Sequence, residues 1–508
     1  MQTSSAVGAA IATRPQLGFS GGHVGSMRSH AAVLEGVALL RPVYWIAGCL
    51  AAAVALRYGG IEAATITFAA LIALWAFAEP RTTLWLSTAF MVFLFVFFQR
   101  EAPLGDELPE EFFFWGSGLA LITAGLIVAA LFSSHVSWAA ARKRFVAPAS
   151  LAMLGMLFAV LAASVYGMFV GNDPFAVVRQ LFGCVLLPVS YFLGLALLRS
   201  SGDVSLWIHR ACWCVALGSL WYAVKLSFAS AALGYYYREQ SPLAGYAGAI
   251  GVIAFSKLIE ERQAWPWLLA FGHLAVCAVA ILLMGSRAAL ASLIVGAGVL
   301  IIVTFRRRGT GAMMTATLLV VGAFAGAMYL GNQMIKKTGL AGDIARRFVI
   351  TVSEDASFRG RMSQMGYVIE EFERHPVLGA GMGSVTVFFA PGMEGRVRVT
   401  SVDNGWGYVM LKTGALGLVA FAVLMSFLFR DSFRGQSRMM AGSLRADRMA
   451  LLGVLVYGLT VFWSGPAFFH FTSAAFFGVL MSGTVILAEA SRSTARASAV
   501  AELPTAMD

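Results

Sequence analysis

The sequence predicts an all-α, polytopic integral membrane protein with about fourteen transmembrane helices and one large extracytoplasmic loop that contains a helix. Of the 508 residues, 59% are hydrophobic and only 12% are charged, whereas soluble domains carry roughly 25% charged residues. Apolar runs also recur along the chain, and about 20 such residues suffice to cross a bilayer as a helix. These two observations exclude a soluble enzyme.

The N-terminal region predicts a disordered cytoplasmic tail over residues 1–32. This region is rich in Gly, Ser and Ala and contains Arg14 and Arg28. It lacks an apolar core followed by a cleavage site, so it is not a signal peptide.

The net charge of +11 does not indicate a nucleic-acid partner, because the basic residues are scattered among predicted helix ends. Such an excess is expected from membrane orientation signals alone. The five cysteines all lie inside apolar runs and are expected to be small buried hydrophobes. Their pattern favours neither a disulfide framework nor a metal site.

Fourteen apolar runs are candidate spans, and they divide the chain. Spans one to eleven occupy residues 33–331, spans twelve to fourteen occupy 404–490, and a cytoplasmic tail follows over 491–508. The candidate spans are 37–56, 61–79, 83–98, 112–133, 149–170, 176–198, 206–228, 241–258, 265–285, 288–305, 312–331, 404–429, 448–465 and 467–488.

Four dense basic sites set the expected orientation, since short loops rich in Lys and Arg stay in the cytoplasm. With fourteen spans and both termini inside, all four sites fall on the cytoplasmic face of the membrane. The 332–403 segment is then a large periplasmic loop. The basic sites are 142–144, 306–308, 430–448 and the C-terminal tail.

The periplasmic loop is expected to contain a helix from Ala356 to Arg374. Met362, Met365, Ile369 and Phe372 recur at three- and four-residue steps and predict its apolar face. Pro376 ends the helix.

A run of three alternating glycines follows this helix, at Gly379, Gly381 and Gly383. One interpretation is a flexible turn that returns the chain to the membrane. The other is a nest of backbone amides that faces phosphate.

Single arginines in the predicted outer connections are candidates for anion binding. Arg179, Arg238 and Arg287 lie where the orientation rule disfavours positive charge. The guanidinium fork binds phosphate or carboxylate through two parallel hydrogen bonds. With Arg361 these residues predict a cluster that holds an anionic ligand; the alternative is that each one snorkels to headgroups or caps a helix.

Two further residues have both a structural and a catalytic interpretation. His375 precedes a proline at a helix end and is either a cap or a base. Asp403 lies where the chain re-enters the membrane, so it either caps the twelfth helix or acts as a general base. Lys225, inside an apolar span, is a candidate buried ion partner.

The segment from about Arg179 to Gly417 resembles the family of O-antigen ligases and Wzy-type polysaccharide polymerases. Three motifs carry most of the resemblance, and Gly285-Ser286-Arg287 and Arg238 to Pro242 are further matches. The three motifs are Arg359-Gly360-Arg361, the block from His375-Pro376 to Gly383-Ser384, and Asp403-Asn404-Gly405 through Lys412 to Gly417.

This resemblance implies a membrane glycosyltransferase that uses sugars carried on undecaprenyl diphosphate and needs no metal or other cofactor. The implied partners are the lipid-linked donor, a glycan acceptor, the bilayer, and flippase and chain-length or export proteins. A base, Asp403 or His375, takes the proton from the acceptor hydroxyl, which attacks with inversion. The implied diphosphate-binding residues are Arg179, Arg238, Arg287, Arg359 and Arg361.

One departure from the family pattern favours a polymerase over a ligase. Ligases that transfer O-antigen to lipid A core usually have a His before the Asn of the last motif, and here that residue is Asp403. We therefore expect a polymerase of repeat units in exopolysaccharide or O-antigen synthesis. The alternatives are a ligase, a solute transporter, or a non-catalytic scaffold in an export complex.

Overall fold

The structure, a computed structural model, is built almost wholly of helices. It describes residues 24–98, 110–132, 136–233, 243–261, 263–308, 356–389, 396–399, 402–434 and 442–501. The chain forms two compact units, Met1–Phe68 and Ala69–Asp508. Helix α1 (Val24–Ala78) begins in the first unit, and Gly60, with a φ of 74°, kinks it between the first two predicted spans.

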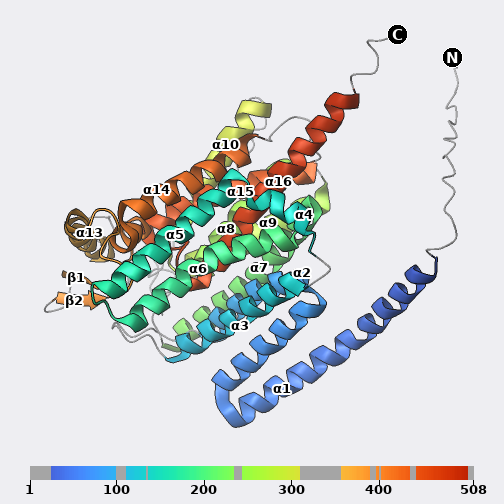
Figure 1. Cartoon of the computed structure of the whole chain (residues 1–508), viewed down its shortest axis with the longest axis horizontal. Coiled ribbons are helices and arrows are strands. Elements are labelled where there is room, and N and C mark those ends of the chain that lie inside the picture. Colours follow the sequence, from blue (N-terminus) through green and yellow to red (C-terminus); the bar gives the residue numbers. More distant parts are fainter. Residues whose placement is uncertain are drawn as a thin grey trace. The chain divides into compact units, whose positions relative to one another are not determined.

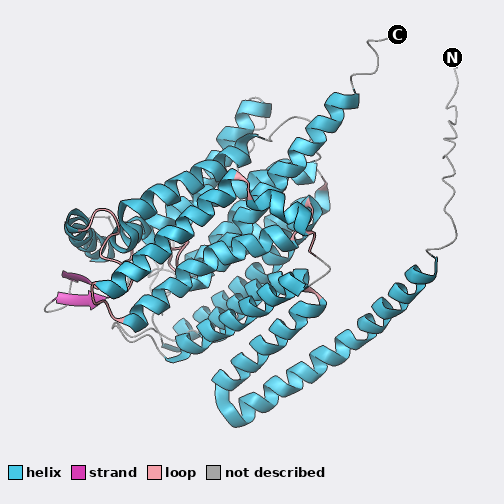
Figure 2. Cartoon of the chain, viewed as in Figure 1, coloured by secondary structure: helices cyan, strands magenta, loops and turns pink. Residues whose placement is uncertain are grey.

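The remaining elements follow in chain order (Figures 1 and 2). They are α2 (Pro80–Phe98), α3 (Glu110–Phe132), α4 (Trp138–Phe145), α5 (Pro148–Phe169), α6 (Pro174–Leu197), α7 (Ser201–Leu233), α8 (Leu243–Glu260), α9 (Ala264–Leu283), α10 (Arg287–Arg308), α13 (Ala356–Arg374), β1 (Thr386–Phe389), β2 (Arg396–Val399), α14 (Gly405–Arg434), α15 (Gly442–Val461), a 3-10 turn (Phe462–Ser464) and α16 (Phe471–Ala501).

Eight of the described helices are long and apolar enough to cross a membrane: α5, α6, α8, α9, α10, α14, α15 and α16. This supports the predicted multi-pass membrane protein. Every predicted span except 312–331 coincides with a described helix, and 312–331 lies outside the described residues. The count of fourteen therefore stays a prediction.

The predicted tails differ from the structure at both ends. Residues 24–32, expected in a disordered tail, belong to α1, and this stretch contains good helix formers such as Arg28 and Ala31. Helix α16 continues to Ala501, well into the predicted tail of 491–508.

Within the second unit, α6 packs along α16, α5 along α14, and α8 between α9 and α15. Polar contacts gather where several of these helices end. Arg144 donates to the carbonyls of Leu198 and Arg199, both at 2.7 Å, and pairs with Glu489 at 2.7 Å. It thereby satisfies carbonyls that α6 leaves unpaired at its C-terminus.

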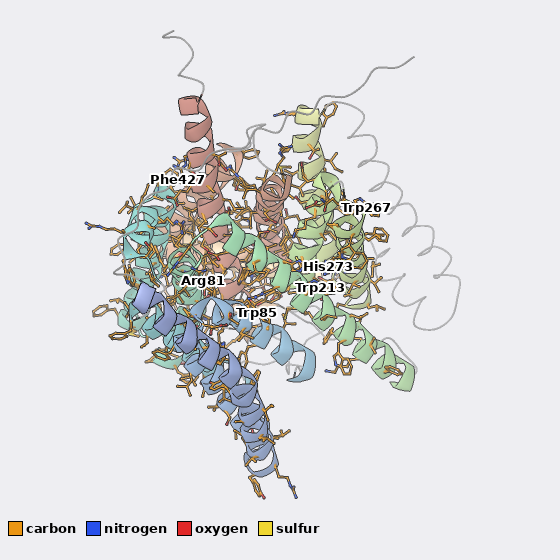
Figure 3. The ribbon with its side chains drawn as sticks, turned by 90° about the vertical axis from the view of Figure 1, so that its right-hand side faces the viewer. Arg81, Trp85, Trp213, Trp267, His273 and Phe427 are labelled. Atoms are coloured by element: carbon orange, nitrogen blue, oxygen red, sulfur yellow. The ribbon has the colours of Figure 1, made fainter. Side chains whose placement is uncertain are left out.

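Arg448, only 2% exposed, serves the same end of the unit. It donates to Asp431 O of α14 and to Ser491 Oγ of α16. Arg81 at the start of α2, labelled in Figure 3, pairs with Asp203 at the start of α7 at 3.1 Å. We call this end, marked by Arg144, Arg448 and Arg81, the basic end.

The opposite end of the same helices carries α13, the β1–β2 hairpin and the start of α14. The hairpin pairs antiparallel, with Thr386 opposite Val399 and Phe389 opposite Arg396. It was not predicted from the sequence, although the stretch Arg396-Val-Arg-Val399 alternates as a strand does.

Helix α13 begins and ends at the predicted residues, but its packed face is not the predicted one. Met362 and Ile369 are 57% and 44% exposed, whereas Val368 and Gln364 are buried. The Gln364 side chain accepts a hydrogen bond from Asp403 N. A polar residue therefore lies on the packed face of α13, where the periodicity predicts an apolar one.

Candidate functional site

Helix α13 lies beside the first turns of α14 and runs parallel to them. Midway along α13, Gln364 Oε1 accepts from Asp403 N at 3.1 Å. The next residue, Met365, lies against Gly407, one turn further along the other chain segment. After α13 ends, Pro376 O accepts from Ala415 N at 2.8 Å. These contacts fix the second half of α13 against α14.

Asp403 lies just before α14 but does not cap it. The cap is Asn404, whose Oδ1 accepts from Trp406 N at 2.9 Å and from Gly407 N at 3.1 Å. The capping interpretation of Asp403 is therefore wrong by one residue, and its carboxylate is left for other contacts.

The Asp403 carboxyl group lies within electrostatic reach of the Arg361 guanidinium, about one helical turn from the contact between Gln364 and Asp403 N. The residue reaches the surface, yet the protein packed around its carboxyl group removes hydration and raises its pKa above the ordinary 3.8. The charge of Arg361 lowers that pKa, but by less. The result is an aspartate whose pKa is shifted towards the range suited to a general base.

Arg361 and Arg359 point to different surroundings although both lie in the first turns of α13. Arg361 is half-buried, and among the described residues its Nε donates to no protein acceptor. A buried donor without an acceptor costs about 1–3 kcal/mol, which an anionic ligand would relieve. Arg359 is exposed, and two residues correspond to about 200° around a helix.

His375 lies at the far end of α13 from Arg361. Its Nδ1 is 3.2 Å from Tyr166 Oη, and the two rings are 6.3 Å apart. At about 1.5 Å per helical residue, Arg361 and His375 are about 20 Å apart. The structure thus brings Asp403, not His375, next to Arg361.

The glycine run packs tightly against the membrane helices. Gly379, Gly381 and Gly383 all have positive φ, at 65°, 81° and 79°. A Cβ on Gly381 would lie 2.7 Å from Gly167 Cα of α5, and one on Gly379 would lie 2.4 Å from Leu411 O of α14. No side chain fits at these two positions, so the run is not a flexible turn.

The amides of this run are already engaged by the protein. Ala380 N donates to Leu411 O at 2.7 Å, Met382 N to Ala163 O at 3.1 Å, and Gly383 N to Gln180 Oε1 at 2.8 Å. Asn172 Nδ2 donates to the carbonyls of Ala380 and Met382. The amide-nest interpretation is therefore wrong, since these donors are not available to phosphate.

Helix α14 is interrupted where the glycine run meets it. Gly414 has a φ of 63° and a ψ of −156°, and a Cβ there would lie 2.5 Å from Val377 O. The apolar stretch Gly405–Phe433 has 29 residues, about 44 Å at 1.5 Å per residue, which exceeds a hydrocarbon core of about 30 Å. The helix is therefore longer than a hydrocarbon core requires, and its first turns, before Gly414, lie beside α13.

Lys412 belongs to these first turns and was given no role from the sequence. It is 0% exposed, and its Nζ donates to the carbonyl and the hydroxyl of Ser384. Nearby, Cys184 Sγ and Tyr408 Oη are 3.7 Å apart, beside a cavity of about 10 Å³ that has room for about one water molecule. The signal that could have found Lys412 is a lysine inside an apolar run.

The other predicted arginines lie on different elements. Arg179, half-buried in the second turn of α6, acts electrostatically on Tyr408 and Lys412. Arg287 begins α10, which packs against α8 and α15, and is also half-buried. Arg238 lies outside the described residues. Lys225 lies 5.8 Å from the centre of the Tyr222 ring.

The family comparison selects the same region. Residues 272–422 match the model of the O-antigen ligase family, which confirms the predicted resemblance. The matched segment begins in α9 and ends in α14, so it includes Arg287, Arg361 and Asp403. No curated protein matches the chain.

Proposed function

We propose that this protein, whose residues 272–422 form an O-antigen ligase-type segment, polymerises lipid-linked oligosaccharide repeat units in exopolysaccharide or O-antigen synthesis. The donor is a glycan on undecaprenyl diphosphate. The observation that carries the proposal is the contact between Gln364 of α13 and Asp403 N. It leaves Arg361, one turn earlier on α13, within electrostatic reach of Asp403 at the end of the unit opposite the basic end.

In this proposal Arg361 binds the diphosphate of the donor. The guanidinium fork matches phosphate oxygens, and its buried Nε has no acceptor among the described residues. When the bond between the anomeric carbon and the phosphate oxygen breaks, negative charge develops on the diphosphate. A fixed guanidinium stabilises that charge.

Asp403 is the proposed general base. The acceptor hydroxyl gives its proton to the Asp403 carboxylate, its oxygen forms the new bond to the anomeric carbon with inversion, and undecaprenyl diphosphate leaves. Asp403 suits this role better than His375, which is about 20 Å from Arg361 and has its Nδ1 engaged by Tyr166.

The proposed location is the periplasmic face of the inner membrane. Lys and Arg in short loops remain cytoplasmic, which assigns the basic end of Arg144 and Arg448 to the cytoplasm. The end with α13 is then periplasmic, where a flippase delivers lipid-linked glycans and where chain-length or export proteins act. Both termini are proposed to be cytoplasmic.

Arg179, Arg238, Arg287 and Arg359 complete the proposed set of cations for the lipid diphosphate. Arg179 is the best supported of these, because its neighbour Gln180 contacts the glycine run. Arg359, exposed at the start of α13, is suited to the distal phosphate or to lipid headgroups.

The test compares Arg361→Ala with Arg374→Ala in a deletion strain. Arg374 lies on the same helix, is 64% exposed and pairs with Glu371, so its loss controls for a missing charge on α13. We expect Arg361→Ala to abolish polymer with the protein still in the membrane. Arg361→Lys should also impair synthesis, because lysine lacks the bidentate fork.

Normal polymer in the Arg361→Ala strain would overturn the assignment. The deletion strain itself separates polymerase from ligase, the alternative that the name of the matched family favours. Single repeat units that accumulate on the lipid indicate a polymerase. Long lipid-linked polymer that is missing from lipid A core indicates a ligase, and no change in either pool would favour a transporter.

A further inference from the structure

The turn that joins α15 to α16 packs against the start of α14, where Asp403 is found. The Phe462 ring covers Gly405 so closely that a Cβ on this glycine would overlap it. The same ring lies 5.3 Å from the ring of Trp406, centre to centre. Three residues after Phe462, a Cβ on Gly465 would lie 3.9 Å from Asp403 O. The turn therefore adjoins the proposed base.

Asp403 has α13 on one side and this turn on another. Its N donates to Gln364 of α13, and its O lies next to Gly465 of the turn. Arg361 belongs to α13, one helical turn before Gln364. In an inverting displacement the nucleophile approaches from the face opposite the leaving group. The diphosphate and the acceptor sugar therefore need separate places around Asp403, and the turn offers the second place.

Trp463 is the large aromatic side chain that this turn exposes. It is 65% exposed, whereas Phe462 before it is 0% exposed. Ser464 after it donates from its Oγ to the carbonyl three residues earlier, at 2.8 Å. The backbone is thus fixed on both sides of Trp463. Two residues span at most about 7 Å, so Trp463 is close to Gly465 and to Asp403.

An exposed indole on a fixed turn suits the apolar face of a sugar ring. The face of an aromatic ring is negative, and the C–H groups on one face of a pyranose present weakly positive hydrogens to it. Tryptophan offers a large contact area and loses little conformational entropy on binding. The sugar hydroxyls lie around the rim of this contact, so one of them remains free to meet a base.

We propose that Trp463 is the platform on which a sugar ring of the acceptor stacks, which presents the acceptor hydroxyl to Asp403 from the side of the turn. This inference rests on the proposed function, since it takes Asp403 as the base. Trp463 would touch the acceptor glycan and not the lipid diphosphate. Its loss should therefore affect one of the two ligands.

The experiment measures the binding of two ligands to the purified full chain in detergent by calorimetry. The first ligand is the glycan that mild acid releases from the lipid pool of the deletion strain, which has sugar hydroxyls and no diphosphate. The second is undecaprenyl diphosphate. The variants are Trp463→Leu, which stays apolar and loses the ring, and Trp463→Phe, which keeps a smaller ring. The matched control is Trp265→Leu, the same change at a 70% exposed tryptophan of α9.

We expect Trp463→Leu to weaken glycan binding by about three- to tenfold and to leave the binding of undecaprenyl diphosphate as in the wild type. Trp463→Phe should fall between the two, and Trp265→Leu should bind both ligands normally. In turnover, Trp463→Leu should raise the KM for the acceptor more than it lowers kcat. If Trp463 only anchors the turn at the membrane interface, Trp463→Leu will bind the glycan as the wild type does, which refutes the platform.

The two ligands separate this inference from the proposed function. A wild type that binds undecaprenyl diphosphate and a Trp463→Leu variant that binds the glycan equally well refute the platform and leave the proposed function standing. So does a wild type that binds the diphosphate and no glycan. A wild type that binds neither ligand refutes the proposed function as well. Should Trp463→Leu fail to fold, Trp463→Met gives the same comparison.

Discussion

An alanine at Gly381 should destabilise the protein far more than an alanine at Gly171. Both glycines have similar backbone conformations, with φ of 81° and 84°. Each substitution therefore costs about 1–2 kcal/mol for placing a side chain in the left-handed region. At Gly171 nothing lies within 4 Å of the added Cβ, so Gly171→Ala carries no steric cost in addition to this conformational one.

Gly381 adds a steric cost to the conformational one. Its Cβ would lie 2.7 Å from Gly167 Cα and 2.8 Å from Gly167 N, and these are backbone atoms of α5 that cannot rotate away. Overpacking of this kind costs about 1–3 kcal/mol. The expected total for Gly381→Ala is about 2–5 kcal/mol, against about 1–2 kcal/mol for Gly171→Ala.

The assay heats the two purified variants in detergent and measures the fraction that stays monodisperse, with polymer synthesis in cells as a second readout. Gly381→Ala should melt below Gly171→Ala and should make less polymer, since the displaced turn carries Ser384 with it. Equal melting temperatures and equal polymer for the two variants would refute the close approach of the glycine run to α5.

Three further predictions concern the start of α14 and the end of α13. If Asp403 is the base, glycosyl transfer should fall as the pH drops through the pKa of Asp403, which burial has raised above 3.8. A rate–pH profile of the purified enzyme should show this loss at a higher pH than an ordinary aspartate gives. The Asp403→Asn variant should be inactive at every pH. Asn404→Ala removes the cap of α14 and should cost about 1 kcal/mol, measured as a lower melting temperature in detergent. Tyr166→Phe removes the hydroxyl beside His375 and should leave turnover close to wild type; a loss as large as that of Arg361→Ala would return His375 to the reaction.

The sequence predicted the helices well because their signal is local. Apolar runs marked every span that the structure describes as a helix, and the bounds of α13 followed from its periodicity and from Pro376. The face of α13 that packs against the protein could not be predicted from the local sequence. Its packed face depends on Gln364, whose partner Asp403 N lies 39 residues further along the chain.

The candidate site was predicted in composition more than in geometry. Arg361 and Asp403 were both selected, but nothing in the sequence showed that they lie together while His375 lies at the other end of α13. The predicted cap of α14, Asp403, is one residue away from the observed cap, Asn404. Residue propensities do not distinguish the two, because both Asp and Asn cap helices.

The conformation of the glycine run likewise depends on segments that are distant in the sequence. From the sequence alone, alternating glycines predict either a flexible turn or an anion-binding site. Only the neighbouring surfaces show that Gly381 meets Gly167 and that Gln180 takes the amide of Gly383. Lys412 was overlooked for a related reason, since its partner Ser384 comes from a different segment.

The contacts of the glycine run also constrain the order in which the protein assembles. The run contacts Ala163 and Gly167 of α5, Gln180 of α6, and Leu411 of α14. Ribosomal synthesis delivers α5 and α6 first, then the run, and α14 last. A nascent chain that has not yet inserted α14 lacks the contact with Leu411, so the run reaches its final position only once the C-terminal helices are in the bilayer. A chain that ends before α14 therefore lacks the fixed turn between α5, α6 and α14, even though every residue of the run has been made.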